Sequence, residues 1–458
     1  TAGADMSLID LSTTVRHSPR LDSLPVAIVG AGPVGLATAA NLVERGIEFV
    51  VYESGPTAAS SMTAWRHIRL FSAWRELVDP AARRLLAETG WPEPSPAVAP
   101  YAAELIDDYL VPLATLEPIA SRTRTGITVL SVTREGMDRT RSAGRETAPF
   151  TLRLEDNDRA VSEVAARAVI DASGTYAQPN SLSSNGLEPL GFADVADRIT
   201  HALPDVLGSD RARFAGRRVA VVGAGHSAAN TLINLAKLAR VDSATKVLWV
   251  IRNANAARVS ATADDELPGR ASLAEQVTRL VENGSIELVD SFEIVRLNST
   301  PTGAVLVGSR RGSLEEIEVD VVVNATGFRP NLEMLREIRL DLDAVVEAPR
   351  RLAPLIDPNV HSCGTVRPHG FAELQHPETN FFIAGMKSYG RAPTFLLATG
   401  YEQVRSIVAW LDNDMAAAST VQLSLPETGV CSTGERGGSS CCLMDERRPA
   451  GIGRLLLI

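Results

Sequence analysis

The sequence predicts an α/β fold made of two related units, in each of which helices cover a parallel sheet. Two observations carry this prediction. An apolar run that ends in a glycine-rich turn occurs near residue 30 and returns near residue 223. A second kind of apolar run, which ends in small residues, follows each glycine-rich turn at a distance. Strand, turn and helix in this order are typical of parallel α/β folds.

The first glycine-rich turn follows residues 26–29, which are all apolar, as a strand buried on both faces requires. Gly30 allows a tight turn, Gly32 lets the backbone approach a pyrophosphate, and Gly35 lets the next helix pack close to the sheet. Residues 36–45 are expected to be helical, with N-terminal amides facing phosphates.

The next expected strand, residues 49–52, ends in Glu53, eighteen residues after Gly35. A carboxylate at this place accepts hydrogen bonds from a ribose. Strand, glycine turn, helix, strand and terminal acid together favour a Rossmann-like dinucleotide site over an ordinary βαβ unit.

The second copy of the pattern spans residues 218–228, with glycines at Gly223 and Gly225 and Ala228 in the third small position. Its following strand, residues 246–251, leads to Arg252, which we align with Glu53. A guanidinium pairs with a 2′-phosphate and cannot accept from a ribose diol, so Arg252 favours NADPH over NADH. The alternative is a surface arginine without a ligand.

The second unit is expected to be inserted within the first. A strand at residues 320–324 ends in small residues and Pro-Asn, as residues 171–180 do, and a closing strand is expected at residues 380–385. The predicted organisation is an N-terminal extension (1–22), a first part of the first dinucleotide-binding domain (23–185) with a helical insert (54–118), an NADPH domain (186–335), a second part of the first domain (336–412) and a flexible cysteine-containing tail (413–458).

The insert carries three of the five tryptophans, Trp65 among them. Such a segment either covers the cofactor or forms a peripheral helical layer, with helices near residues 79–89 and 101–116. Both interpretations stay open at this point.

Composition narrows the function classes. The hydrophobic fraction of 45% is typical of a globular chain, and a net charge of −10 argues against nucleic-acid binding. No apolar run approaches the ~20 residues that a membrane span needs, and no signal peptide is visible. The four cysteines, Cys363, Cys431, Cys441 and Cys442, form no CxxC pair. We therefore expect a cytoplasmic protein.

On the glycines, Glu53, Arg252 and the linker residues 325–328, the chain resembles the two-dinucleotide-domain flavoproteins, above all the NADPH-dependent flavin monooxygenases of the N-/S-oxidising and Baeyer–Villiger class. Residues 387–395 and the tail also look like bacterial flavoproteins associated with arsenic and metal resistance. The resemblance implies FAD and NADPH as cofactors, with FAD in the first domain (23–185 and 336–412) and NADPH in the second (186–335). It also implies a C4a-(hydro)peroxyflavin that oxygenates a small substrate with O2. From the charge and the apolar pattern we expect no nucleic-acid or membrane partner, and a homodimer stays open.

Candidate site residues follow from these patterns. The helix expected from about residue 393 would direct its N-terminus at the flavin. The catalytic candidates, chosen for their position beside cofactor elements, are Arg69, Ser72, Lys387 and Arg391. The cofactor-binding candidates are Gly30, Gly32, Pro33, Gly35, Glu53, Ser54, Trp65, Val129, Ala172, Ser173, Gly174, Gly223, Gly225, His226, Ser227, Arg252, Ala325, Thr326, Gly327, Gly385, Pro393, Thr394 and Phe395.

Three other functions stay open. A disulphide reductase shares both units, but it needs a dithiol against the flavin, and the first cysteine of the chain is Cys363. The tail thiols Cys431, Cys441 and Cys442 could accept electrons from the flavin, or hold a soft metal ion or an arsenical. The chain could also be a redox sensor that binds FAD and NADPH without turnover.

Overall fold

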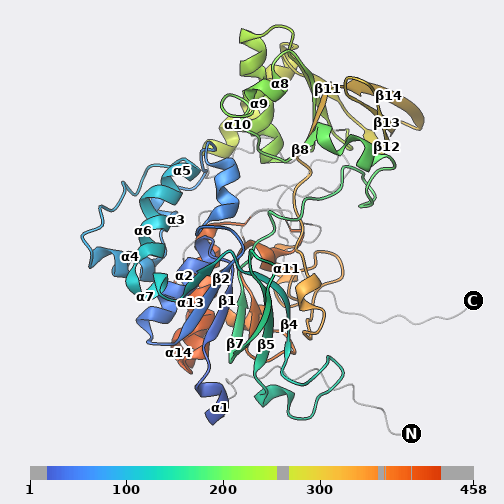
Figure 1. The fold of residues 1–458 in the computed structure, drawn as a ribbon. Coiled ribbons are helices and arrows are strands. Elements are labelled where there is room, and N and C mark those ends of the chain that lie inside the picture. Colours follow the sequence, from blue (N-terminus) through green and yellow to red (C-terminus); the bar gives the residue numbers. More distant parts are fainter. Residues whose placement is uncertain (1–17, 255–267, 359–365, 367, 393–394, 424–458) are drawn as a thin grey trace, which may run out of the picture.

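The computed structural model describes residues 18–254, 268–358, 366, 368–392 and 395–423 (Figure 1). Two parallel sheets, each with its own helices, lie at opposite ends of the molecule, and two connecting segments run between them.

The first sheet contains five parallel strands in the order β16-β7-β1-β2-β3. Strands β1, β7 and β16 are buried along their whole length, as their apolar sequences predict. The strands of this sheet are β1 (Val26–Val29), β2 (Phe49–Glu53), β3 (Thr123–Thr125), β7 (Ala168–Asp171) and β16 (Phe381–Ile383).

Helices α2 (Pro33–Glu44) and α13 (Leu397–Leu411) pack against each other over this sheet, and the insert after β2 adds a helical layer beside them (Figure 1). The remaining helices of this part are α1 (Pro19–Asp22), α3 (Trp74–Leu77), α4 (Pro80–Ala87), α5 (Ala102–Leu105), a π-helical turn (Ile106–Leu110), α6 (Val111–Thr115), α7 (Glu117–Ala120), α11 (Ala353–Ile356), α12 (Phe371–Leu374) and α14 (Met415–Ser419). Short 3₁₀ segments lie at Ser60–Trp65, Arg145–Thr147, Glu333–Leu335 and Gly385–Tyr389.

The second sheet is also parallel, with the order β11-β10-β9-β15-β8. Its strands are β8 (Ile199–Thr200), β9 (Arg218–Val222), β10 (Lys246–Val250), β11 (Glu287–Val289) and β15 (Val321–Asn324). Its helices are α8 (Arg211–Phe214), α9 (His226–Val241) and α10 (Pro268–Glu282), and a 3₁₀ segment spans Phe192–Arg198.

The two halves repeat one layout. The order β7-β1-β2-β3 in the first sheet corresponds to β15-β9-β10-β11 in the second. Each half also carries an antiparallel three-stranded meander before its last shared strand. The meanders are β4 (Thr128–Arg134), β5 (Phe150–Glu155) and β6 (Val161–Ala166), and β12 (Phe292–Ser299), β13 (Ala304–Arg310) and β14 (Ser313–Val319).

All strands of the second sheet lie between β7 and β16 in the sequence, so the expected fold class, with one Rossmann-like unit inserted in the other, is confirmed. The sequence patterns did not predict β6 or the second meander. The edge strands β6 and β14 are largely exposed, and their apolar residues do not alternate strictly with polar ones. The helix expected from about residue 393 begins at Leu397, and residues 393–394 and the tail after residue 423 lie outside the described residues.

The two segments that connect the units pair with each other. Asn180 donates from its backbone N–H to the carbonyl of Gly327 (2.9 Å), and Arg329 donates to the carbonyl of Gln178 (3.0 Å). The rings of Tyr176 and Phe328 lie 5.2 Å apart across this pairing. The connection is therefore a short two-stranded ribbon.

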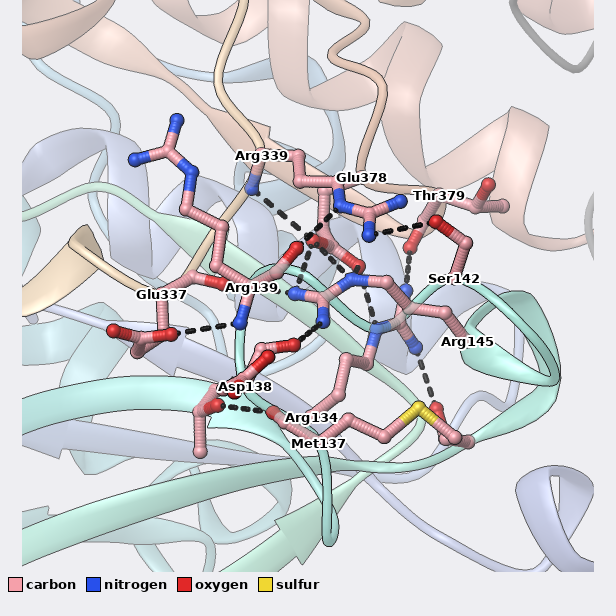
Figure 2. Close-up of polar contacts among 12 residues, drawn as sticks. Arg134, Met137, Asp138, Arg139, Ser142, Arg145, Glu337, Arg339, Glu378 and Thr379 are labelled. Carbon is pink, nitrogen blue, oxygen red and sulfur yellow. Dashed lines mark hydrogen bonds and ion pairs between the residues drawn. The ribbon is translucent and has the colours of Figure 1, made fainter.

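A buried charge cluster joins the first meander to the segment before β16 (Figure 2). Glu378 accepts from Arg134 Nε (2.7 Å) through Oε1 and from Arg145 Nη2 (2.8 Å) through Oε2, and the three side chains are at most 4% exposed. The Arg134 guanidinium also lies 3.7 Å from the centroid of the Phe150 ring. Burial by itself raises the pKa of Glu378, but the hydrogen bonds and charges of the two arginines hold that pKa below its usual value.

Within the described part of the chain, no helix combines the length and apolarity that a membrane span requires.

Candidate cofactor and active site

The first glycine-rich turn leaves space at one position and none at the two others. Gly30 has a φ of +98°, and a Cβ there would lie 2.9 Å from the carbonyl oxygen of Ala172. A Cβ on Gly35 would lie 1.9 Å from the carbonyl oxygen of Gly30. A Cβ on Gly32, in contrast, would meet no atom within 4 Å. Gly30 and Gly35 therefore serve the turn itself, whereas Gly32 borders open space of the kind that a pyrophosphate needs.

Helix α2 begins at this open space. Gly32 is its N-cap, no side chain caps the helix, and Pro33 occupies the first helical position. The first-turn amides and the positive end of the helix dipole are thus available to an anion.

Glu53 stabilises the same turn. Its Oε2 accepts from the Ala31 backbone N–H (2.8 Å), and its Oε1 accepts from the Gly55 N–H (2.8 Å). The carboxylate is buried and keeps further lone pairs for ribose hydroxyls. Ser54 beside it is exposed, and Val129 is buried at the start of the meander in the same hydrophobic cluster as Tyr52.

The end of β7 carries a closed ring of polar contacts. Asp171 Oδ1 accepts from the Ser173 hydroxyl (2.6 Å), and Asp171 Oδ2 lies 2.6 Å from Lys387 Nζ. Lys387 Nζ also donates to Ser173 Oγ (3.1 Å). The Lys387 and Asp171 side chains are 2% and 0% exposed. Gly174 follows with a φ of +70°, and a Cβ there would meet no atom within 4 Å.

The Lys387 loop, whose residues Gly385–Tyr389 form a 3₁₀ turn, is held in place by a buried glutamine side chain. Gln403 of α13 accepts from the Gly385 backbone N–H (2.8 Å) and donates to Ser388 Oγ (2.9 Å). Gly385 has a φ of +71° and lies against the Val34 side chain of α2. Sequence reasoning missed Gln403, because its neighbours Glu402 and Arg405 are polar as well and no local pattern marks it.

The second glycine-rich turn repeats the first. A Cβ on Gly223 would lie 2.1 Å from the carbonyl oxygen of Ala325, and a Cβ on Gly225 would meet no atom within 4 Å. Helix α9 begins directly after Gly225 with His226 and Ser227. The Trp249 indole N–H donates to the Gly223 carbonyl (2.7 Å), a contact that the sequence did not reveal.

The strand register corrects the alignment of Arg252 with Glu53. Tyr52 pairs with Val29 in the first unit, and Val250 pairs with Val222 in the second. The residue that corresponds to Glu53 is therefore Ile251, which is buried. Arg252 lies one position further and is exposed beyond the strand end. The alignment was wrong by one residue because the strand expected over residues 246–251 ends at Val250.

The strand ends next to the two turns differ in charge. Asn324 Oδ1 accepts from the Thr326 hydroxyl (2.7 Å), as Asp171 Oδ1 does from Ser173. The Asn324 amide then donates to the carbonyl of Asn180 (2.9 Å), where Asp171 instead faces Lys387. Gly327 follows with a φ of +98°.

The insert reaches both units. The backbone N–H of Ala59 donates to the Ala31 carbonyl in the first turn (3.0 Å). The Phe71 ring lies edge-on to the His226 ring at the start of α9, with centroids 5.4 Å apart. Ser72 is buried beside Phe71, and Trp65 is half-buried against the core that contains α2. The segment from Ala59 to Ser72, which makes both contacts, therefore lies between the two glycine-rich turns.

Two arginine candidates have partners of their own. Arg69 donates to the Ala99 carbonyl (3.1 Å) and lies over the Tyr101 ring. Arg391 pairs with Glu347 (2.7 Å), and its side chain is 42% exposed. Phe395 contacts the Tyr389 ring with centroids 5.1 Å apart. Pro393, Thr394 and the cysteines Cys363, Cys431, Cys441 and Cys442 lie outside the described residues.

Comparison with known proteins gives a family match over residues 24–380, to pyridine nucleotide-disulphide oxidoreductases. Thioredoxin reductase from Borreliella burgdorferi is 28% identical over 177 residues, which are 38% of this chain and 48% of that protein. The chain thus matches about half the length of this curated relative.

Two solved structures share the fold. Bacillithiol disulfide reductase Bdr (YpdA) from Bacillus cereus has a TM-score of 0.62 at 18% identity, over 85% of this chain and 99% of that one. The second is DfoA from Erwinia amylovora, the cadaverine monooxygenase of desferrioxamine biosynthesis, which was solved with FAD. It has a TM-score of 0.59 at 13% identity, over 90% of this chain and 99% of that one.

The family match covers both glycine-rich turns and every strand of the first sheet except β16. Proteins of this kind are oxidoreductases that bind FAD and use NADPH, and the two open turns described above fit these two nucleotides. The chain therefore belongs to the pyridine nucleotide-disulphide oxidoreductase family and has FAD and NADPH as its cofactors.

Proposed function

We propose that this chain is an NADPH-dependent flavin monooxygenase, which oxygenates a small substrate with O2. The observation that carries the proposal is the absence of any cysteine before Cys363 in the sequence. Both glycine-rich turns, the insert and the whole second unit precede that residue. A direct disulphide reductase needs a thiol pair on these elements, whereas an oxygenase needs none.

The two glycine-rich turns and the residues beside them would each bind a different nucleotide. Gly32 and the first turn of α2 would hold the FAD diphosphate, and Glu53 would accept from its ribose. Gly225 and the first turn of α9 would hold the NADPH diphosphate, with the exposed Arg252 as the partner of the 2′-phosphate.

Bound FAD would take a hydride from NADPH and in its reduced form react with O2. Oxygenation then requires that water be kept from the site. Phe71 and the buried Ser72 supply part of this shield, because their loop lies between the turns of the two units. Of the four catalytic candidates, Lys387 and Ser72 are buried beside the cofactor elements, whereas Arg69 and Arg391 engage other partners.

Rapid mixing of the NADPH-reduced protein with O2 tests the proposal. We expect a spectral species that is distinct from reduced and oxidised flavin and that outlasts the mixing time by far. Direct return of the oxidised flavin spectrum, with stoichiometric release of H2O2 under every substrate tried, would contradict an oxygenase.

A thiol-dependent reductase is the second candidate, because the curated relative is a thioredoxin reductase and Bdr reduces a disulfide. In this chain the electrons would pass to the tail cysteines Cys431, Cys441 and Cys442, or to a thiol-bound soft metal ion or arsenical. Replacement of all four cysteines by serine separates the two functions. An oxygenase keeps its NADPH-dependent O2 uptake in this variant, and a tail-dependent reductase loses its NADPH turnover with disulfide or metal acceptors.

A further inference from the structure

We propose that Lys387 is the cationic contact of FAD in this chain, an ammonium that Asp171 and Ser173 hold in place to neutralise negative charge on the bound cofactor. The inference rests on the binding of FAD and is independent of whether the reaction is oxygenation or reduction.

The internal repeat supplies the first argument. Both units end the strand beside the glycine-rich turn with the same local motif, in which Asp171 or Asn324 accepts from the hydroxyl two residues later. In the second unit a neutral amide completes the motif with a backbone carbonyl. The fold therefore does not need a charge at this place, and the first unit has added a carboxylate and an ammonium to it.

The energetic balance of a buried ion pair supplies the second argument. Removing two charges from water costs several kcal/mol per ion, and a buried pair seldom stabilises a fold more than neutral residues of similar volume do. The Lys387–Asp171 pair is thus poorly explained by stability alone. A requirement for positive charge at this place explains it, with Asp171 as the counter-ion of Lys387.

The location of the pair supplies the third argument. Asp171 is in register with Val29, the last residue before the first glycine-rich turn. The Cα of Ser173 lies 3.0 Å from the place of a Cβ on Gly30. On the other side, Gly385 of the Lys387 loop lies against Val34 in the first turn of α2. The ammonium is therefore enclosed by the elements that border the open space at Gly32.

The ammonium also has donor capacity left. It carries three N–H groups, and the described residues give it two acceptors, Asp171 Oδ2 and Ser173 Oγ. The third N–H can serve an anionic or carbonyl oxygen of the cofactor.

Two parts of FAD offer such an oxygen. The diphosphate is anionic in both redox states. The ring system gains one negative charge on reduction, because a hydride from NADPH brings two electrons with one proton and leaves NADP⁺. Contact with the diphosphate would strengthen the binding of both redox states equally, and contact with the ring would favour the reduced state.

The test uses the full-length holoprotein in three variants. Lys387→Met removes the charge but leaves the Asp171 carboxylate buried without a counter-ion, which can destabilise the fold. The double variant Asp171→Asn/Lys387→Met therefore copies the neutral arrangement of Asn324 and carries the conclusion. Lys246→Met is the matched control, since Lys246 is an exposed lysine at the start of β10 that donates to the Ser243 carbonyl.

The readouts are the dissociation constant of oxidised FAD, the flavin midpoint potential and the melting temperature. We expect the double variant to melt like the Lys246→Met control. If Lys387 contacts the ring, the double variant should lose about tenfold in its preference for reduced over oxidised FAD. This loss corresponds to a shift of the flavin midpoint potential by ~30 mV to more negative values. A contact with the diphosphate predicts weaker binding of oxidised FAD at unchanged potential. If the double variant binds FAD with wild-type affinity and wild-type potential, the proposal is overturned and the pair has a structural role only.

Discussion

The geometry of the first glycine-rich turn predicts that two alanine substitutions three residues apart act in different ways. A Cβ on Gly32 meets no atom within 4 Å, and its φ of −76° suits alanine. We expect Gly32→Ala to cost at most about 1 kcal/mol of stability, through the weaker N-cap. The added methyl group would occupy the open space where the diphosphate binds. Loss of one hydrogen bond to a charged group, about 1.5–3 kcal/mol, predicts about a 10- to 150-fold weaker binding of FAD.

Gly35→Ala is the contrasting variant. Its Cβ would lie 1.9 Å from the Gly30 carbonyl oxygen, whereas real Cβ contacts stay above 3.0 Å, so the helix and the turn must separate by at least 3.0 − 1.9 = 1.1 Å. We expect about 1–3 kcal/mol of lost stability as well as lost FAD.

Both effects are measurable on the purified full-length variants. The recovery of flavin fluorescence on release measures FAD binding, and urea unfolding measures the stability of the fold. The reasoning is refuted if Gly32→Ala binds FAD like the wild type, or if it loses as much apoprotein stability as Gly35→Ala. Gly225→Ala provides a matched control in the second unit, since a Cβ there is also unobstructed. It is expected to weaken NADPH and to leave FAD in place.

Three further predictions concern other parts of the molecule. Arg252→Ala should lower kcat/KM for NADPH about tenfold or more and leave NADH turnover unchanged, because only the 2′-phosphate loses a partner; equal loss with both nucleotides would contradict this role. Glu378→Gln should cost about 3–5 kcal/mol in urea unfolding, since it leaves Arg134 and Arg145 buried without a counter-ion, and a change below 1 kcal/mol would show that the cluster is not needed. Burial raises the pKa of Asp79 to about 6, from 3.8 in its ordinary state. The folded state therefore binds this proton more tightly than the unfolded state, and stability from this group increases as the pH falls from about 7 toward 4, by about 3 kcal/mol in full. Asp79→Asn, which keeps the N-cap of α4, should remove this pH dependence, and an unchanged dependence would assign it to another group.

The arrangement of the site follows from the repeat. Each unit places its nucleotide turn beside the small residues that end a second strand, and in both units the first glycine of the pattern differs from the second. Gly30 and Gly223 are required by the neighbouring carbonyls of Ala172 and Ala325, whereas the middle glycines face open space. This division of tasks explains why one backbone pattern binds two different nucleotides.

The two units differ where their chemistry differs. The loop with Phe71 belongs to the long insert of the first unit, in the place where the second unit has α10. This insert gives the first unit a wall toward the second, and the Lys387–Asp171 pair gives it a buried charge that the second unit lacks.

Much of the fold and of the cofactor site could be predicted from the sequence by itself. The strand, glycine turn, helix and second strand of each unit lie within a short contiguous stretch, so that local apolar patterns and the conformational demands of glycine determine them. The repeat of that stretch was enough to indicate two nucleotides, and the later apolar runs at residues 320–324 and 380–385 indicated the inserted unit. The position of Glu53 at the strand end could be predicted for the same reason, because it ends the strand that directly follows the turn and helix.

The tertiary structure decided what depends on pairing between distant residues. Only the strand register showed that Ile251, and not Arg252, corresponds to Glu53. Lys387 and Ser173 are 214 residues apart in the sequence, and Glu378 and Arg134 are 244 residues apart. No local pattern marks such partners, because a buried charge is tolerated only where packing of the whole chain brings its counter-ion within reach.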